Sequence, residues 1–307
     1  MKENFHNVKA STLFKRQHKA DYGKEKIEIL YEDEFLVVIL KPSGMLSVPY
    51  PGSKARTAQE VLEKIYRSRG ELSANHKPLV VHRLDRDTSG VMMFALNESV
   101  QKKIMASWQT MVTERIYHAV AENPRDKKRF LPDSGLIDAP LAKNAYNVGY
   151  VPVGENKNVD TVEARTNYKI ICRGPTHSLF ELSLDTGKKN QIRAHLSYKG
   201  YPLAGDENYR AKTDPFYRLA LHARTLAFVH PVTGEKMRFE IPEPDEWLAY
   251  VKAGDKNPRV PIWNQKKREN HQKPVKENAP MQKRLSGKKA SHMDFIARGK
   301  AMDGGRF

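Results

Sequence analysis

Short apolar segments separated by tight turns constrain the fold of this chain more than any other feature of its sequence. "FLVVIL" (35–40) and "GVMMFALN" (90–97) have the length of buried strands, and "ERIYHAVAE" (114–122) alternates apolar and polar residues as a strand does. Neighbouring segments of this kind are often joined by turns that are too short for a parallel crossover. The sequence therefore predicts an α+β fold built on a mostly antiparallel mixed sheet flanked by helices.

The helices are marked by their ends as well as by their apolar faces. In residues 56–70, Thr57 and Glu60 form a capping box, and Gly70 stands where a helix C-terminal glycine belongs. Further helices are expected at 98–110, at 188–200 and, capped by Asp245, at 245–254.

The positive charge lies mostly at the two ends of the chain. The 307 residues carry a formal charge of +17. Residues 251–307 hold fifteen Lys and Arg against five Asp and Glu, and residues 1–26 hold seven against three, which leaves +3 for the middle. We expect a basic N-terminal arm (1–26), one folded domain (27–250) and a basic, disordered tail (251–307). A strongly basic chain favours an anionic partner, either nucleic acid or an acidic membrane surface.

Cysteine content and hydropathy restrict the cellular compartment. The single cysteine, Cys172, lies in an apolar run, so we expect a core residue and exclude both an internal disulfide and a cysteine-based zinc cluster. The longest apolar run is far shorter than a membrane span, and the first residues lack the apolar core of a signal peptide. We expect a soluble cytoplasmic protein.

Charged residues gather at the mouth of one predicted strand, in "VVHRLDRDTSGVMMFALN" (80–97). In an extended stretch Arg83, Asp85 and Asp87 would share one side. Positive charges on either side favour a carboxylate at Asp85, and a partly dehydrated carboxylate can serve as a nucleophile or as a base. Two other interpretations stay open, namely a surface ion pair of little energy and a metal site in which Asp85-Arg86-Asp87, a D-x-D pattern, holds a hard cation beside a phosphate.

Several stretches resemble one known family. "HRLDRDTSG" (82–90) resembles the H-R-L-D-x-x-T-S-G signature of the RluA-like family of RNA pseudouridine synthases, with all seven fixed positions matched. "ILYEDEFLVVILKPSGMLSVP", "RIYHAV", "LDTGKKNQIRAHL", "GYPLAGDENY" and "LALHARTLAFVHPVTGE" resemble further family stretches in the same order. The resemblance covers about residues 29–250 and implies that residues 27–250 form a single catalytic domain of the pseudouridine-synthase type.

The resemblance also implies an activity and a set of site residues. The family isomerises uridines within an RNA chain, here rRNA or tRNA, by cutting the glycosidic bond and rejoining the base through carbon. Asp85 would be the essential residue, acting on the base or on the sugar, and Tyr117 would pack on the uracil and move the proton from carbon 5. Arg83 would fill the space left by the flipped uridine, which offsets part of an extrusion cost of a few kcal/mol. Ile192 would form an apolar wall beneath the uracil, and Arg193 would bind the substrate.

The third family motif, T-G-R-x-H-Q-I-R, is altered in this chain. Lys188 stands where the family has an arginine, which we take to pair with the catalytic aspartate. Lysine keeps the charge but loses the bidentate fork, so we expect Lys188 to pair with Asp85 in a looser geometry and count it among the catalytic residues. Asn190 replaces histidine, and we expect it to alter an RNA contact or a local hydrogen bond with less effect on the chemistry.

Partners and alternatives follow from the same residues. The resemblance implies RNA as partner and neither metal nor organic cofactor, and we expect a monomer that needs no protein partner and no membrane. One alternative is a catalytically silent RNA-binding protein of the same fold, against which the intact Asp85 and Tyr117 argue. Another is a metal-dependent transferase built on the D-x-D pattern. Because few residues precede the first strand, we expect target choice to depend on the core, the irregular insert at 123–160 and the basic ends.

Overall fold

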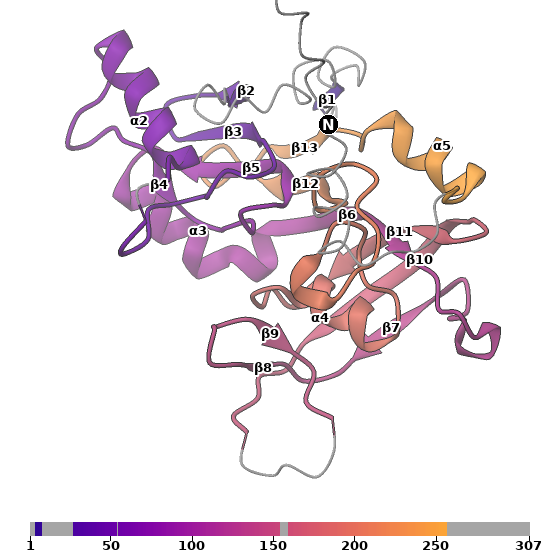
Figure 1. The fold of residues 1–307 in the computed structure, drawn as a ribbon. Helices are drawn as coiled ribbons and strands as arrows, with labels where there is room; N and C mark the ends of the chain where they lie inside the picture. The colour runs from indigo at the N-terminus through magenta and orange to yellow at the C-terminus, as the bar shows by residue number, and fades with distance from the viewer. Residues whose placement is uncertain (1–3, 8–26, 54, 154–158, 257–307) are drawn as a thin grey trace, which may run out of the picture.

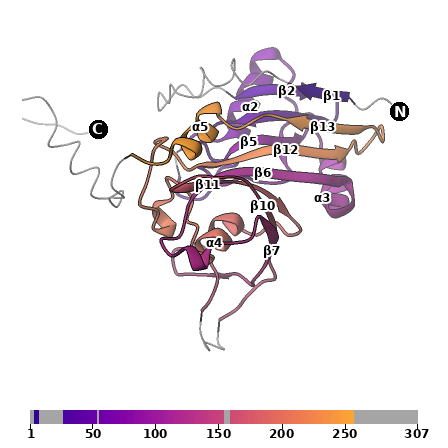
Figure 2. The ribbon, with the colours of Figure 1, turned by 90° about the vertical axis from the view of Figure 1, so that its right-hand side faces the viewer.

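A single large sheet organises the computed structural model, which describes residues 4–7, 27–53, 55–153 and 159–256 (Figure 1). Its strands follow one another in the order β2 (Glu28–Glu32), β3 (Leu36–Lys41), β5 (Ser89–Ala95), β12 (Leu221–Val229), β6 (Val112–Glu122), β11 (His177–Leu184), β10 (Arg165–Arg173) and β7 (Ser134–Asp138). Figure 2 shows this succession from β2 at the top to β7 at the bottom. Three strands branch from it: β13 (Lys236–Glu240) pairs with β12, β1 (Asn4–Asn7) with β13, and β4 (Leu79–Val80) with β5.

Antiparallel pairing dominates this sheet. Among the described strand pairs, the pairing is parallel where β12 meets β5 and where β1 meets β13. The α+β fold expected from the sequence is confirmed. Short turns join β2 to β3, β10 to β11 and β12 to β13, whereas pairings such as β5–β12 and β6–β12 join segments that are far apart in the chain.

The β5–β12 contact requires a glycine. Its register pairs His222 with Ser89 and Ala223 with Gly90. Gly90 has φ 129°, and a Cβ atom placed on it would lie 2.2 Å from the carbonyl oxygen of Ala223. Only a residue without a side chain allows the two backbones to approach this closely. The loop that precedes β5 is thereby fixed against β12.

Helices pack on both faces of the sheet. Because successive side chains of a strand point to opposite faces, each helix contacts alternate residues of the strands. α2 (Ala58–Arg69) and α4 (Gln191–Tyr198) pack on the face that carries Tyr117, in two apolar clusters that both include this residue. α3 (Glu98–Met111) and α5 (Asp245–Ala253) cover the opposite face. Because successive residues of β6 point to opposite faces, Tyr117 lies on the α2–α4 side and His118 on the other. No helix within the described ranges is long and apolar enough to cross a membrane.

The predicted helix ends are confirmed at α2. The Thr57 side chain accepts from the backbone N–H of Glu60, the Glu60 side chain accepts from the N–H of Thr57, and Gly70 follows the helix with φ 75°. Both halves of the capping box are thus formed.

Two other helix starts differ from the prediction. α5 has Pro244 rather than Asp245 at its N-cap, with no side-chain cap, so the Asp245 carboxylate contributes only through the helix dipole in the first turn. α4 begins at Gln191 and not at Lys188, because Asn190 adopts the left-handed conformation with φ 57° and interrupts the helical path.

The insert at 123–160 is more ordered than its composition suggests. It contains the short 3-10 helix η1 (Lys127–Arg129), the strand β7 that joins the main sheet, and a small antiparallel pair of β8 (Ala142–Lys143) and β9 (Gly149–Tyr150). The expected N-terminal arm includes β1, which adds a parallel strand to the edge of β13. The predicted tail lies outside the described residues from 257 onward.

Candidate active site

Asp85 lies in the loop between β4 and β5, and its carboxylate meets side chains from a distant part of the chain. Asn190 Nδ2 donates to Asp85 Oδ2 over 2.6 Å, and Arg193 Nη1 lies 3.4 Å from the same oxygen. The Asp85 side chain keeps 25% of its surface exposed. A carboxylate that is partly dehydrated, oriented on one oxygen and still accessible can take part in a reaction.

The cation beside Asp85 is Arg193 and not Lys188. Lys188 is exposed, and its backbone N–H donates to Gln191 Oε1 ahead of the first turn of α4. Among the described residues its side chain makes no ion pair. The expected pairing of Lys188 with Asp85 is therefore absent, and Asn190 and Arg193 take the contacts with the carboxylate instead. Arg193, which we expected to bind substrate, is buried against Asp85 instead.

A second carboxylate fixes the Arg193 guanidinium. Nε donates to Asp206 Oδ2 over 2.7 Å and Nη2 donates to Asp206 Oδ1 over 2.8 Å, the bidentate geometry that suits arginine. The guanidinium also lies 5.1 Å from the ring centre of Tyr209, which follows in η2 (Glu207–Tyr209). Burial alone lowers the pKa of Arg193, but the hydrogen bonds and charge of Asp206, aided by Asp85, outweigh burial and raise it. Arg193 is a permanent cation at this position.

A backbone link joins the β8–β9 pair to this cluster. The N–H of Gly149 donates to Asn190 Oδ1 over 3.4 Å, and the Tyr209 hydroxyl donates to the carbonyl of Gly149. A Cβ atom on Gly149 would lie 2.6 Å from the carbonyl oxygen of Lys189, so the hairpin can dock this closely only at a glycine. Asn190, Gly149, Tyr209 and Arg193 thus complete a ring of contacts that begins and ends at Asp85.

Tyr117 lies near the same carboxylate on the central strand β6. It is half-buried and packs against the apolar clusters of α2 and α4, the latter containing the buried Ile192. Burial raises the pKa of Tyr117, the nearby Arg115 lowers it, and the Asp85 charge raises it further. The phenol therefore keeps its proton at neutral pH. The structure thus brings Asp85, Tyr117, Ile192 and Arg193 into one neighbourhood.

Arg83 stands apart from these buried residues. It is exposed two positions before Asp85, and within the described ranges it has no hydrogen-bond or ion-pair partner. Asp87 pairs with Arg86 over 3.1 Å at the surface, so the D-x-D residues do not converge on one point. In the part of the chain that the structure describes, no three His, Cys, Asp or Glu side chains are arranged to hold a metal ion.

The backbone of the Asp85 loop is held by one neighbouring segment, residues 41–47. Three side chains of this segment each donate to one loop carbonyl: Ser47 Oγ to Leu84 (2.8 Å), Lys41 Nζ to Arg86 (3.0 Å) and Ser43 Oγ to Asp87 (2.7 Å). Lys41 is completely buried and also donates to the carbonyl of Met45. These bonds fix the path of the loop on both sides of Asp85.

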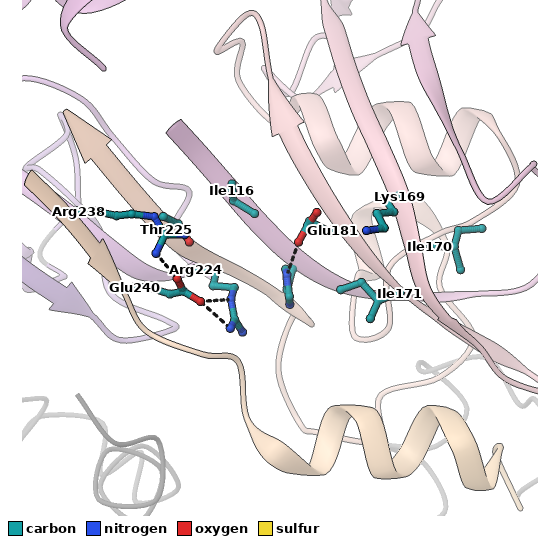
Figure 3. A pocket seen from close by; sticks show the side chains of 10 residues that line it. Ile116, Lys169, Ile170, Ile171, Glu181, Arg224, Thr225, Arg238 and Glu240 are labelled. Carbon is teal, nitrogen blue, oxygen red and sulfur yellow. Dashed lines mark hydrogen bonds and ion pairs between the residues drawn. The ribbon is translucent and has the colours of Figure 1, made fainter. Parts of the chain in front are cut away.

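The cavity in Figure 3 lies on the other face of the sheet. It has a volume of about 410 Å³ and is lined by ten residues, Ile116, His118, Glu181, Arg224 and Glu240 among them. Ile116 and His118 flank Tyr117 on β6 and therefore point away from Asp85. Several of its charged groups are engaged in ion pairs, among them Arg224 and Glu240 at 2.8 Å. This cavity is not part of the Asp85 site.

Three contributors to the site could not be recognised from the sequence: Asn190, Asp206 and Tyr209. Asp206 and Tyr209 lie in "GYPLAGDENY", a stretch that resembles the family, and the sequence predicts for Asn190 an altered RNA contact or local hydrogen bond but not a contact with Asp85. The stretches that resemble the family thus indicate which segments of the chain form the site. Which side chain within each stretch touches Asp85 depends on the docking of α4 and η2, which no local pattern specifies.

Comparison with solved structures identifies the fold. The fold is similar to that of "Human RNA Pseudouridylate Synthase Domain Containing 4" (TM-score 0.58, 21% identity, 78% of this chain and 94% of that one). It is equally similar to "Human RNA Pseudouridylate Synthase Domain Containing 1" (TM-score 0.57, 20% identity, 81% and 96%). The fold is that of a pseudouridine synthase.

Sequence comparison then identifies the family. The family model described as RNA pseudouridylate synthase matches residues 35–198. "Uncharacterized RNA pseudouridine synthase YlyB" of Bacillus subtilis is 34% identical over 232 residues, covering 75% of this chain and 74% of the relative. "Ribosomal large subunit pseudouridine synthase D" of Pseudomonas aeruginosa is 32% identical over 237 residues, covering 73% and 70%. The chain belongs to the RNA pseudouridylate synthase family, of the RluA type, whose members are isomerases.

Proposed function

We propose that this enzyme converts specific uridines of ribosomal RNA to pseudouridine, with Asp85 as the reacting residue and without a metal or an organic cofactor. The observation that carries the proposal is the placement of Asp85, which is accessible, oriented by Asn190 and Arg193, and electrostatically coupled to Tyr117. Of the two RNA classes expected from the sequence, ribosomal RNA of the large subunit is favoured by the name of the Pseudomonas aeruginosa relative. The proposal includes a monomeric enzyme that acts in the cytoplasm.

The two oxygens of Asp85 have different surroundings, and this difference supports a division of labour. Both Asn190 and Arg193 contact Oδ2. Oδ1 accepts no hydrogen bond from any described residue. We assign Oδ2 to orientation and Oδ1 to the reaction, either as nucleophile on the base or sugar or as base on the sugar. Asp85 loses its negative charge when it reacts as a nucleophile or a base. The fixed cation of Arg193 stabilises this charge each time the carboxylate forms again.

Tyr117 and Ile192 serve the uracil in this proposal. The isomerisation moves the glycosidic bond from N1 to C5 of uracil, so C5 must lose one proton and N1 must gain one. Tyr117 stays protonated at neutral pH, so it accepts the C5 proton only as it passes its own on, and we assign it this relay. The buried Ile192 in the same apolar cluster forms the wall against which the base packs.

Arg83 supports the flipping of the target nucleotide. It is exposed beside Asp85 and has no described partner to release before it can move. A planar guanidinium can stack on bases and pair with phosphate, so it can occupy the space that the extruded uridine leaves. Lys188 is exposed at the start of the α4 motif, and we assign it a supporting role in binding the RNA backbone near the site.

The decisive experiment compares two carboxylates of one loop. Asp85→Asn replaces the carboxylate by an amide with little change of shape, whereas Asp87→Asn alters a partly exposed carboxylate two residues away. Tritium release from RNA labelled at C5 of uridine should stop with Asp85→Asn and continue with Asp87→Asn. Substantial turnover by Asp85→Asn would overturn the assignment. Pseudouridine mapping in a strain that lacks the gene identifies the target RNA.

A further inference from the structure

Three of the most exposed aromatic side chains lie on loops that are bonded to the Asp85 site. Tyr50, Tyr146 and Tyr217 expose 63%, 88% and 83% of their surface. A fourth tyrosine, Tyr198, is 44% exposed but lies at the end of α4, with Lys199 Nζ 5.0 Å from its ring centre. Large aromatic surfaces left in water are suited to contact with a partner.

Tyr50 follows the segment that holds the Asp85 loop. It lies three residues beyond Ser47, whose hydroxyl donates to the carbonyl of Leu84. The carbonyl of Tyr50 accepts from the N–H of Ser53 over 3.1 Å, which closes a turn at this point. The Tyr50 loop is therefore tied to the residue that directly precedes Asp85.

Tyr146 lies in the turn between β8 and β9. Asn144 Oδ1 accepts from the N–H groups of both Tyr146 and Val148 over 3.0 Å, which gives the turn a defined shape. Val148 is followed by Gly149, whose N–H donates to Asn190 Oδ1, and Asn190 in turn donates to Asp85. Tyr146 is thus connected to the carboxylate through a short series of contacts.

Tyr217 is held outward by a backbone conformation that aromatic residues rarely adopt. Its φ is 53°, in the left-handed region, where a residue with a side chain is strained. Phe216 on one side is buried against Trp247. Arg218 on the other side donates to Ser89 Oγ over 2.6 Å, within the same motif as Asp85. The two anchored neighbours maintain the strain, and the ring between them faces solvent.

We propose that Tyr50, Tyr146 and Tyr217 form an aromatic platform on which unpaired bases next to the target uridine stack. This inference rests on the proposed function and extends it to the shape of the substrate, an RNA loop or single strand rather than a continuous duplex. Flipping one nucleotide exposes the faces of its neighbours, and tyrosine rings offer them a new stacking surface that is independent of base identity.

Charge around the three loops fits the same partner. Arg83, Arg86, Lys188 and Lys189 are exposed at the site. Cations position an RNA backbone, while aromatic rings between them accept its bases, a combination typical of single-strand binding. Base–aromatic stacking changes RNA affinity by roughly tenfold for each base. The platform therefore contributes binding, and we expect it to affect affinity more than the rate at saturating RNA.

The test measures binding apart from turnover. In the Asp85→Asn background, each tyrosine is changed to Ala and to Phe, and affinity is measured by fluorescence anisotropy with an RNA hairpin that carries an unpaired uridine loop. A fully paired RNA duplex is the comparison probe, and Tyr198→Ala is the matched control. The variants change exposed side chains, and thermal unfolding verifies that each is folded.

The platform predicts one pattern of results. Each Ala variant should bind the hairpin about tenfold more weakly, while the Phe variants and Tyr198→Ala should bind it as the parent does and duplex binding should stay unchanged. Unchanged hairpin affinity of the Ala variants would overturn the proposal, and equal losses with Ala and Phe would replace stacking by a hydroxyl contact. Because this assay reads affinity and the tritium assay reads turnover, failure of the platform and failure of the proposed function are distinguishable.

Discussion

Asn190 donates to Asp85 across a sequence separation of 105 residues, and at 2.6 Å it is the shortest contact of the carboxylate with a described residue. The asparagine occupies a position where the family motif has histidine, and we expected it to matter little to the chemistry. The structure instead places its amide on the oxygen that also faces Arg193. Asn190 is thus a direct neighbour of the Asp85 carboxylate.

The first prediction concerns this amide. Asn190→Gly removes the side chain but keeps the left-handed conformation without strain. A hydrogen bond to a charged group contributes about 1.5–3 kcal/mol, so single-turnover tritium release should slow by roughly ten- to a hundredfold. Asn190→His, which restores the family residue, should retain more activity than Asn190→Gly. An Asn190→Gly enzyme as fast as the parent would show that the amide does not orient Asp85.

The second prediction separates Arg193 from Lys188. Arg193→Met leaves Asp206 buried without its cation, so the free energy of unfolding should fall by about 3–5 kcal/mol and turnover should be lost. Lys188→Met removes an exposed cation and should raise the Michaelis constant for RNA more than it lowers the turnover number. Urea unfolding and steady-state kinetics measure the two effects. Loss of turnover in Lys188→Met at saturating RNA would restore Lys188 as the partner of Asp85.

The third prediction concerns the crossing of β5 and β12. Gly90→Ala places a methyl group 2.2 Å from the backbone of Ala223, so the strands must separate and the Asp85 loop must move. We expect a loss of at least ~3 kcal/mol in the free energy of unfolding, or failure to fold. Gly52→Ala is the matched control, since Gly52 also has a positive φ of 84° but nothing within 4 Å. The control should cost only about 1 kcal/mol, as backbone strain. Equal losses in the two variants would show that strain and not contact is responsible.

The fourth prediction concerns pH and His222. Its Nε2 donates to the carbonyl of Ile241, its Nδ1 accepts from Ser89, and burial, with Arg218 nearby, lowers its pKa to about 3. As the pH falls below about 6.5, His222 therefore binds a proton in the unfolded chain but stays neutral in the folded chain. The resulting stability is complete above pH 6.5 and is lost as the pH falls towards 3, by up to about 1.4 kcal/mol per pH unit. Urea unfolding between pH 7.5 and 4.5 measures this slope.

His82 contributes a loss of the same sign, because burial and the nearby Arg115 lower its pKa to about 3 as well. Replacing His222 by Gln removes one titrating group and should flatten the dependence of stability on pH between 6.5 and 4.5. A slope identical to that of the parent would mean that His222 is already protonated in the folded protein.

The fifth prediction concerns residues 257–307, which hold thirteen Lys and Arg against four Asp and Glu. A chain cut after Lys256 keeps every element described above and should retain turnover. Counterion release makes binding by such cationic segments steeply dependent on salt. RNA affinity titrated over a salt series should therefore show a smaller slope for the truncated enzyme. Equal slopes would exclude an RNA contact by this segment.

Local patterns predicted the elements well, and the reasons are visible in particular residues. Thr57, Glu60 and Gly70 define α2 through contacts within a few positions, so the sequence contains all the information about its ends. The Asp85 motif was recognisable because its fixed residues lie within nine positions. The predicted ion pair between Lys188 and Asp85 was wrong. The helix begins only after Asn190, and Arg193 is the cation that lies beside Asp85. Such contacts depend on how distant elements dock, and no local pattern contains that information.

The β5–β12 contact determines when the Asp85 site can assemble during synthesis of the chain. Asp85 lies in the first third of the chain, but Asn190, Arg193 and the strand that contains Ala223 are synthesised more than a hundred residues later. Long-range pairings form late in folding because the loop between them must first be closed. An unfinished chain on the ribosome therefore presents Asp85 without Arg193, and we expect activity to begin only after most of the domain has been released and has packed.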